Sequence, residues 1–294
     1  MTGGQCFRWS SNAIAIQNGR LATPGEWPWI ALVLLNKYSE NKTIVKRCTG
    51  SILNTNWILT AAHCILPNFT LTVRTVQDMR DTMGYTYSVD QSFVHTGYPN
   101  KTIGGKPDKR YDIALVKLVE QIPILDNNNT DNTTTDTNTN TTTSDGHHRY
   151  QQPMSVNSIC LPDKDIVNTE NELALMAGFG YIDDGVDNYG PLMMGGQMIA
   201  EPFFNENDSN GTFIIGYRHP LNLASAAVCR GDSGSPLIQY AGGRAVLIGT
   251  HRASNRDYGN GTVRECTIQN IYARMYYIRV SLVIDWIIDT VINN

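Results

Sequence analysis

The protein is a chain of 294 residues with 23 Lys and Arg, 27 Asp and Glu and a formal net charge of −4 at pH 7. Its basic residues are dispersed, so neither the balance nor the distribution of charge indicates a nucleic acid or an anionic membrane as partner. The length suits two ordinary domains or one large β domain with a substantial core.

The N-terminal segment, residues 1–15, holds Cys6 and lacks both the basic start and the apolar run of a signal peptide. We therefore infer that the given start is truncated or artificial. From about residue 29 to 125, short apolar stretches alternate with polar turns. Three of these stretches, 29–35, 50–53 and 71–76, have the length and composition of antiparallel strands.

Two further strands of this region have polar residues at their ends. An apolar stretch that starts at Trp57 leads into His63 and Cys64, and Asp112 stands before the alternating apolar run 113–118. A histidine can serve as a general base, and an aspartate can orient it. Each also has a structural interpretation, His63 as a satisfied core histidine and Asp112 as a strand cap.

Residues 126–149 are rich in Asn and Thr and contain no apolar side chain. Such a segment cannot bury surface, so we expect a disordered insertion. His147 and His148 lie near its end, and we interpret them as solvated side chains, not metal ligands. The chain also has many Asn-x-Ser/Thr sequons, which agree with a glycosylated, secreted protein. They begin at Asn41, Asn68, Asn100, Asn128, Asn132, Asn140, Asn207, Asn210 and Asn260.

The C-terminal region has apolar residues at positions 282, 283, 286, 287 and 291. This spacing predicts an α-helix over about 281–292 that packs on the body of the protein. The run carries two aspartates and is too short to span a bilayer.

The stretch from Cys229 to Pro236 contains Gly231, Asp232 and Ser233. A serine is a poor nucleophile unless a base removes its proton and donors stabilise the resulting oxyanion. Glycines around this serine would let the backbone N–H groups of Gly231 and Ser233 converge on an oxyanion. The same residue types also make ordinary surface turns.

His63, Asp112 and Ser233 occur in the chain order of a base, its orienter and a nucleophile, and with their flanks they resemble the chymotrypsin-like serine proteases. Further motifs of that family appear in the family's order. They are 16–19, 24–29, 158–162, 177–180, 271–274 and 285–287.

The resemblance implies an all-β fold of two six-stranded antiparallel Greek-key barrels packed together, with a C-terminal α-helix. It implies a pro-segment at 1–15 and a protease domain at 16–294. Within that domain the first barrel would occupy about 29–125 and the second about 173–275, with the insertion 126–149 between them.

The resemblance also assigns roles in peptide-bond hydrolysis. Ser233 would attack the carbonyl carbon, His63 would take and return the proton, and Asp112 would fix the imidazole tautomer. The N–H groups of Gly231 and Ser233 would form the oxyanion hole. This chemistry needs no cofactor or metal, and we expect neither.

Six cysteines allow fifteen pairings, and from the residues alone they could also be reduced thiols or zinc ligands. No Cys-x-x-Cys pair is present, and the adjacent His63 and Cys64 are poorly spaced for one metal. The resemblance implies three disulfides, namely Cys48 with Cys64, Cys229 with Cys266, and Cys6 with Cys160.

The same resemblance places the substrate pocket at Ala227 and Val228, with Ser254 and Asn270 in its walls. Without a carboxylate there, a buried Lys or Arg of a substrate would lack a counter-charge. Because Ser254 and Asn270 would partly fill the pocket, it should favour substrates with a small aliphatic residue at this position.

Activation in this family frees an α-amino group at the position of Ile16, which pairs with the residue matching Asp232. Here Ala15 precedes Ile16, so a trypsin-like activator has no basic residue to recognise. An elastase-like enzyme or the protein itself would fit this bond.

Two interpretations remain from the sequence. The first is a secreted, monomeric endopeptidase whose partners are protein or peptide substrates and protein protease inhibitors. The second is a protease-like binding protein that keeps the three residues but has an altered pocket and activation site. The stretch from Thr250 to Ser254 supports the second, because Arg252 and Ala253 stand where relatives carry a Ser-Trp-Gly strand.

Overall fold

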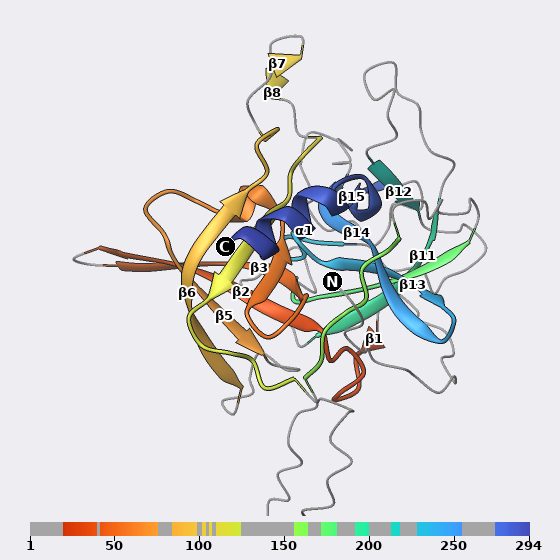
Figure 1. The fold of residues 1–294 in the computed structure, drawn as a ribbon, viewed down its shortest axis with the longest axis horizontal. Coiled ribbons are helices and arrows are strands. Elements are labelled where there is room, and N and C mark those ends of the chain that lie inside the picture. Colours follow the sequence, from red (N-terminus) through yellow and green to blue (C-terminus); the bar gives the residue numbers. More distant parts are fainter. Residues whose placement is uncertain are drawn as a thin grey trace, which may run out of the picture.

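The computed structural model describes twelve segments of the chain, and all structural statements below concern these residues. They are 20–39, 42–75, 84–98, 102–103, 106–107, 110–124, 156–163, 172–180, 192–199, 213–217, 228–254 and 274–294. Figure 1 shows two groups of strands side by side, the N-terminal group in orange and yellow and the C-terminal group in green and blue.

The N-terminal group is a closed barrel in the order β2-β3-β4-β9-β6-β5, and all its pairings are antiparallel. Its strands are β2 (Ile30–Ser39), β3 (Lys42–Ile52), β4 (Trp57–Thr60), β5 (Thr70–Thr75), β6 (Tyr85–Val94) and β9 (Ala114–Leu118). The interior is an apolar cluster that includes Val33, Ile58 and Val116. Strands β4 and β9 are buried almost throughout, because one face lines this interior and the other packs against the rest of the protein.

The C-terminal group is an antiparallel sheet in the order β1-β11-β10-β13-β14-β15-β12, and an additional pairing of β11 with β12 closes six of its strands into a second barrel. Its strands are β1 (Arg20–Leu21), β10 (Leu173–Gly178), β11 (Met193–Ile199), β12 (Phe213–Tyr217), β13 (Pro236–Ala241), β14 (Arg244–Ser254) and β15 (Arg274–Arg279). The predicted architecture of two six-stranded barrels is therefore confirmed.

The largest apolar cluster joins both barrels. It includes Trp27 and Trp29, whose rings meet edge to face at 5.7 Å, together with Leu115 of the first barrel and Phe179 and Ile278 of the second. Because this cluster draws side chains from both barrels, it packs the two barrels against each other.

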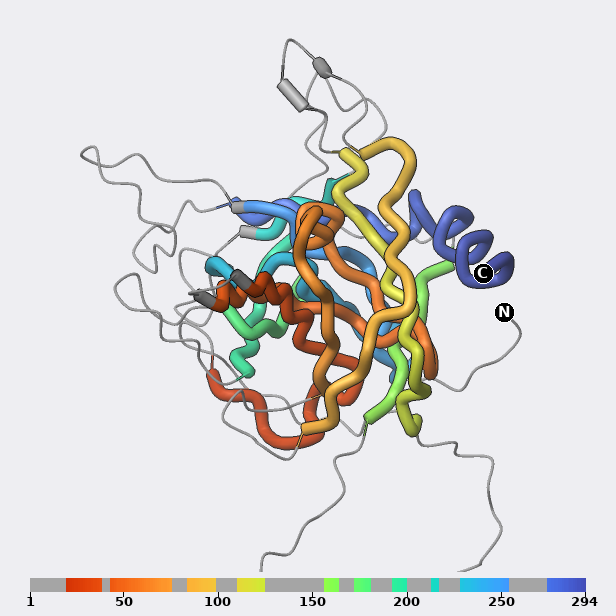
Figure 2. Tube along the Cα trace, turned by 90° about the vertical axis from the view of Figure 1, so that its left-hand side faces the viewer, coloured from red at the N-terminus to blue at the C-terminus, as the bar shows by residue number. Residues whose placement is uncertain are grey.

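Helix α1 (Ile284–Asn293) follows the short 3₁₀ helix η3 (Val280–Leu282) and ends the chain. Its residues Ile284 and Ile287 are buried while Asp285 and Asp289 face solvent, as the helical spacing predicts. Leu282, expected on the packed face, is instead 48% exposed because it precedes the helix. Figure 2 shows α1 along one edge of the body.

The remaining elements are η1 (Ala62–Cys64) and a small hairpin of β7 (Thr102–Ile103) and β8 (Lys106–Pro107). This hairpin projects from the body in Figure 1. No helix among the described residues is long and apolar enough to cross a membrane.

Candidate active site

His63 and Asp112 meet because two strands of the first barrel pair in an antiparallel manner. Thr60, the last residue of β4, pairs with Ala114, the first residue of β9. His63 lies three residues beyond one strand, and Asp112 lies two residues before the other. Antiparallel pairing therefore brings the histidine loop to the aspartate.

The imidazole and the carboxylate are directly hydrogen-bonded. His63 Nδ1 lies 2.9 Å from Asp112 Oδ2, and the backbone N–H of His63 donates to Asp112 Oδ1, also at 2.9 Å. The aspartate side chain is 3% exposed and the histidine side chain is 35% exposed. A carboxylate only accepts, so Nδ1 carries the proton and Nε2 of the neutral ring is left as a base at the surface.

Ser233 is held close to Cys64, the neighbour of His63, because β3 binds its loop. Thr49 N–H donates to the Ser233 carbonyl oxygen at 2.8 Å, and Cys64 Sγ lies 3.9 Å from the same oxygen. A disulfide joins Cys48, which precedes Thr49, to Cys64, which follows His63, with a Cα–Cα distance of 6.3 Å. The predicted pairing of these two cysteines is confirmed. Within the described residues, no hydrogen bond joins His63 Nε2 to the Ser233 hydroxyl.

The loop around Ser233 leaves two backbone donors unused. The N–H groups of Asp232, Gly234 and Ser235 each donate to a backbone carbonyl. Those of Gly231 and Ser233 have no partner among the described residues. Since buried N–H groups are nearly always paired, these two donors are available to an acceptor outside the described residues.

Two glycines of this loop have conformations that other residues avoid. Gly231 has φ +99° and Gly234 has φ +85°. A Cβ on Gly234 would overlap the carbonyl oxygen of Thr49 and the hydroxyl of Thr60. Glycine at this position therefore permits the close approach of the Ser233 loop to the first barrel.

Asp232 points away from Ser233 into the protein. Its carboxylate accepts the N–H groups of Gly180 and Cys229, both at 2.8 Å, and no cation pairs with it in the part of the chain described. Burial raises its pKa from 3.8 to about 6, although both hydrogen bonds lower the pKa. Gly178 and Gly180 make the space, since a Cβ on either would overlap this carboxylate or come within 2.5 Å of it.

Arg252 brings a positive charge close to Asp112. From the sequence this residue belongs to the strand that pairs with substrate in relatives, but no contact is predicted for it. Its Nε lies 3.8 Å from Asp112 Oδ2, and its guanidinium carbon lies 5.3 Å from the centre of the Phe213 ring. The side chain is 18% exposed. Asp112 thus faces a histidine and a cation together.

Two further residues near Ser233 were missed by the motif-based interpretation. Thr49 donates its hydroxyl to the Gly231 carbonyl at 3.1 Å, and the ring of His251 lies 3.2 Å from the Asp232 carbonyl oxygen. No motif marks either contact, because each joins segments far apart in the chain.

The substrate pocket and the activation site fall largely outside the described residues. Ala227, Asn270 and Ile16 all lie outside the described residues. Val228 is described and is buried in the core of the second barrel. Ser254 ends β14 opposite Met275, and nothing is described of its side chain.

The other two expected disulfides are partly described. Cys160 and Cys229 are each disulfide-bonded. Their expected partners, Cys6 and Cys266, lie outside the described residues. Among the described side chains, no group of three or more His, Cys, Asp or Glu could hold a metal ion.

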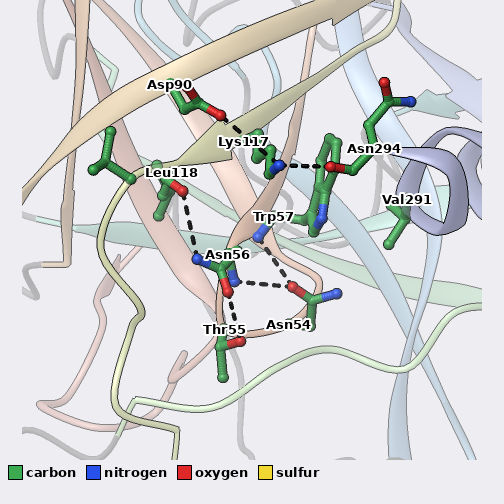
Figure 3. A pocket seen from close by; sticks show the side chains of 10 residues that line it. Asn54, Thr55, Asn56, Trp57, Asp90, Lys117, Leu118, Val291 and Asn294 are labelled. Carbon is green, nitrogen blue, oxygen red and sulfur yellow. Dashed lines mark hydrogen bonds and ion pairs between the residues drawn. The ribbon is translucent and has the colours of Figure 1, made fainter.

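A cavity of about 660 Å³ lies between the first barrel and the end of α1 (Figure 3), and its lining includes none of His63, Asp112 and Ser233. Its polar side chains bond mainly to the protein. Lys117 Nζ donates to the Asn294 carbonyl at 2.5 Å, and Asn54 Oδ1 accepts the N–H groups of Asn56 and Trp57. We assign it no ligand.

The sequence matches the family model described as Trypsin over residues 16–287. It is similar to the venom peptide isomerase heavy chain of Agelenopsis aperta, 28% identical over 254 residues that cover 80% of this chain and 87% of the relative. It is also similar to coagulation factor IX of Oryctolagus cuniculus, 24% identical over 292 residues that cover 94% of this chain and 85% of the relative. A third relative, the hepatocyte growth factor activator serine protease of Mus musculus, is 24% identical over 294 residues, which cover 94% of this chain and 36% of the relative.

Proposed function

Since the chain belongs to the trypsin family of serine proteases, we propose that it is a secreted serine endopeptidase that cleaves peptide bonds through an acyl-enzyme. The Ser233 hydroxyl attacks the substrate carbonyl while His63 Nε2 takes its proton. The resulting oxyanion binds the N–H groups of Gly231 and Ser233. His63 then returns the proton to the leaving amine, and water repeats the sequence to release the acid.

One observation carries this proposal, namely the hydrogen bond of 2.9 Å between His63 Nδ1 and Asp112 Oδ2. It holds the ring in the tautomer whose Nε2 is a base, and the buried carboxylate stabilises the imidazolium that forms during attack. The two open N–H groups beside Ser233 support it, because they match the charge that develops on the substrate oxygen.

The substrate class follows from the expected pocket residues. Ala227 and Val228 offer no carboxylate to a Lys or Arg side chain, and Ser254 and Asn270 would narrow the walls. We propose cleavage after small aliphatic residues. The partners are then proteins or peptides with such residues, and protein inhibitors that present them.

The chain as given is an unprocessed precursor in this proposal, because Ile16 is joined to Ala15. Asp232 is buried with two N–H partners, and no cation among the described residues pairs with it. Cleavage of the bond between Ala15 and Ile16 would supply the missing α-amino group. This bond follows a small residue, so it fits the proposed specificity of the protein itself.

A protease-like binding protein without activity is the second candidate, and Arg252 favours it. A cation 3.8 Å from Asp112 Oδ2 competes with the imidazolium for the carboxylate. In this alternative the cleft binds a protein segment and does not cut it.

A fluorophosphonate probe distinguishes the two functions. The precursor is first cut before Ile16 with an elastase-like enzyme, the new terminus is sequenced, and the elastase is removed. The endopeptidase predicts stoichiometric labelling that maps to Ser233 and is lost in the Ser233→Ala variant. A correctly processed, folded protein that takes up no label would contradict the endopeptidase and favour the binding protein. A peptide library then tests the preference for small residues.

A further inference from the structure

The loop that carries Ser233 is held by one side chain from each barrel. Thr49 of β3 donates its hydroxyl to the Gly231 carbonyl oxygen at 3.1 Å. His251 of β14 has its ring Nδ1 3.2 Å from the Asp232 carbonyl oxygen. The two successive peptide carbonyls that precede Ser233 are thus each bound by a side chain.

The direction of the Thr49 hydrogen bond is fixed by its surroundings. The side chain is fully buried, and its hydroxyl oxygen accepts the N–H of Phe179 at 3.2 Å. A hydroxyl has one hydrogen, and a carbonyl can only accept, so that hydrogen goes to Gly231. The same peptide unit is also held by the Asp232 N–H, which donates to the Cys229 carbonyl at 3.1 Å, so Thr49 adds a second restraint on Gly231, a residue whose backbone is intrinsically permissive.

The direction of the His251 hydrogen bond follows in the same way. A carbonyl oxygen cannot donate, so the tautomer that makes this hydrogen bond carries its proton on Nδ1. The residue is 3% exposed, its backbone N–H donates to Ser235 and its carbonyl accepts from Gly234, both at 2.8 Å. Its ring also packs edge to face on Tyr277, with centroids 5.4 Å apart. Backbone and ring are therefore both held.

These two contacts bear on the open donors because a peptide unit is planar. In a trans peptide the C=O of one residue and the N–H of the next point in opposite directions. A hydrogen bond from His251 to the Asp232 carbonyl therefore fixes where the Ser233 N–H points. The hydrogen bond from Thr49 restrains the peptide unit between Gly231 and Asp232. It therefore limits the rotation of Gly231, whose own N–H is the second donor.

We propose that Thr49 and His251 are positioning residues that aim the N–H groups of Gly231 and Ser233 at the substrate oxyanion. The inference rests on the proposed function and deepens it, since it names the groups that preorganise the oxyanion site. Neither side chain touches the substrate in this proposal. Their effect is on the transition state, where the negative charge is present, and not on ground-state binding.

The test compares variants of the full chain processed at Ile16. Thr49→Val and His251→Leu remove the donors, whereas Thr49→Ser and His251→Asn keep a donor near the same place. Thr250→Val is the matched control, because Thr250 is equally buried beside His251 and its hydroxyl has no hydrogen-bond partner among the described residues. Urea unfolding of each variant shows that it is folded.

We expect Thr49→Val and His251→Leu to lower kcat by about 10- to 100-fold with little change in KM, less than the loss of a whole donor. Binding of a small-residue peptide boronate, whose tetrahedral adduct places an oxygen in the oxyanion site, should weaken by the same factor. Thr49→Ser, His251→Asn and the control should stay within about threefold of the parent. A rise in KM at constant kcat, or unchanged boronate binding, would overturn the proposal.

A second readout separates this proposal from the proposed function. If the processed parent neither cleaves nor takes up a fluorophosphonate, the proposed function fails, and the ¹H–¹⁵N signal of the Ser233 amide still reports its orientation. This signal should shift in Thr49→Val and His251→Leu and keep the parent position in Thr49→Ser and His251→Asn. A signal that is unchanged in all four variants would show that neither side chain orients the donor.

Discussion

The ring of His251 lies against the backbone of Asp232, with His251 Nδ1 3.2 Å from the Asp232 carbonyl oxygen, and both the ring and the Asp232 carboxylate are buried. Burial moves their pKa values in opposite directions. It lowers the pKa of His251 from 6.5 to about 4, helped by the nearby His63, and it raises the pKa of Asp232 from 3.8 to about 6. Hydrogen bonds from Gly180 and Cys229 oppose the shift of Asp232, and Asp112 opposes that of His251.

These shifts predict two opposing pH dependences of folding. Between about pH 4 and 6.5 the unfolded chain holds a proton on His251 that the folded chain lacks, so stability rises with pH. Between about pH 4 and 6 the folded chain holds a proton on Asp232 that the unfolded chain lacks, so stability falls with pH. In the unprocessed protein the two contributions nearly cancel.

Single variants should expose each contribution in urea unfolding at a series of pH values. Between pH 4 and 6.5 the free energy of unfolding of Asp232→Asn should rise by about 3 kcal/mol more than that of the parent. Between pH 4 and 6 the free energy of unfolding of His251→Leu should fall by about 3 kcal/mol relative to that of the parent. The comparison uses the slope of the free energy of unfolding against pH and not its absolute value, because both variants also lose hydrogen bonds. Parallel curves for parent and variants would contradict the prediction.

Cleavage before Ile16 should stabilise the folded protein at neutral pH. We expect the new α-amino group to reach Asp232, whose carboxylate is buried without a cation among the described residues. The ion pair exists only above the pKa of the carboxylate and below that of the amine, near 8 in a free chain. The gain in Tm on processing should therefore be present at pH 7 and shrink well above the pKa of the paired amine.

The control for this prediction is Asp232→Asn, in which processing should bring little gain in Tm at any pH. A parent protein whose Tm does not change on verified cleavage at Ile16 would show that the new terminus does not pair with Asp232.

The glycine at position 234 should be required for folding of the Ser233 loop. A Cβ there would overlap the Thr49 carbonyl oxygen, and φ is +85°. Gly234→Ala should therefore lower the free energy of unfolding by several kcal/mol, about 3 or more. Gly242→Ala is the matched control, because φ is +57° but no atom lies within 4 Å of the added carbon. It should cost about 1 kcal/mol. Equal losses in both variants, by urea unfolding, would refute the steric argument.

The sequence predicted the two barrels and pointed to His63, Asp112 and Ser233 as site candidates because the signals are local. Strand patterns and turn residues lie next to each of the three side chains. The antiparallel pairing of Thr60 with Ala114 then brings two of them together, as expected for adjacent strands.

The positioning contacts could not be predicted, because they depend on which atoms meet across the fold. Thr49 and Gly231 are 182 residues apart, and Thr49 looks like any threonine of a β-strand. His251 stands in a buried strand where the sequence pattern favours an apolar residue. Arg252 is expected from the sequence to alter the substrate strand, but its approach to Asp112 joins residues 140 positions apart, which local patterns do not encode.

Arg252 should restrain the rate of the proposed reaction. Its Nε lies 3.8 Å from Asp112 Oδ2, so the carboxylate that must stabilise the His63 imidazolium is shared with a permanent cation. The guanidinium also packs on Phe213, which holds it in the cleft. We expect Arg252→Gln to raise kcat about threefold or more at neutral pH. Arg252→Lys, which keeps the charge, should behave more like the parent. The opposite result, with lower activity in Arg252→Gln and recovery in Arg252→Lys, would mean that the cation supports the charge on Asp112.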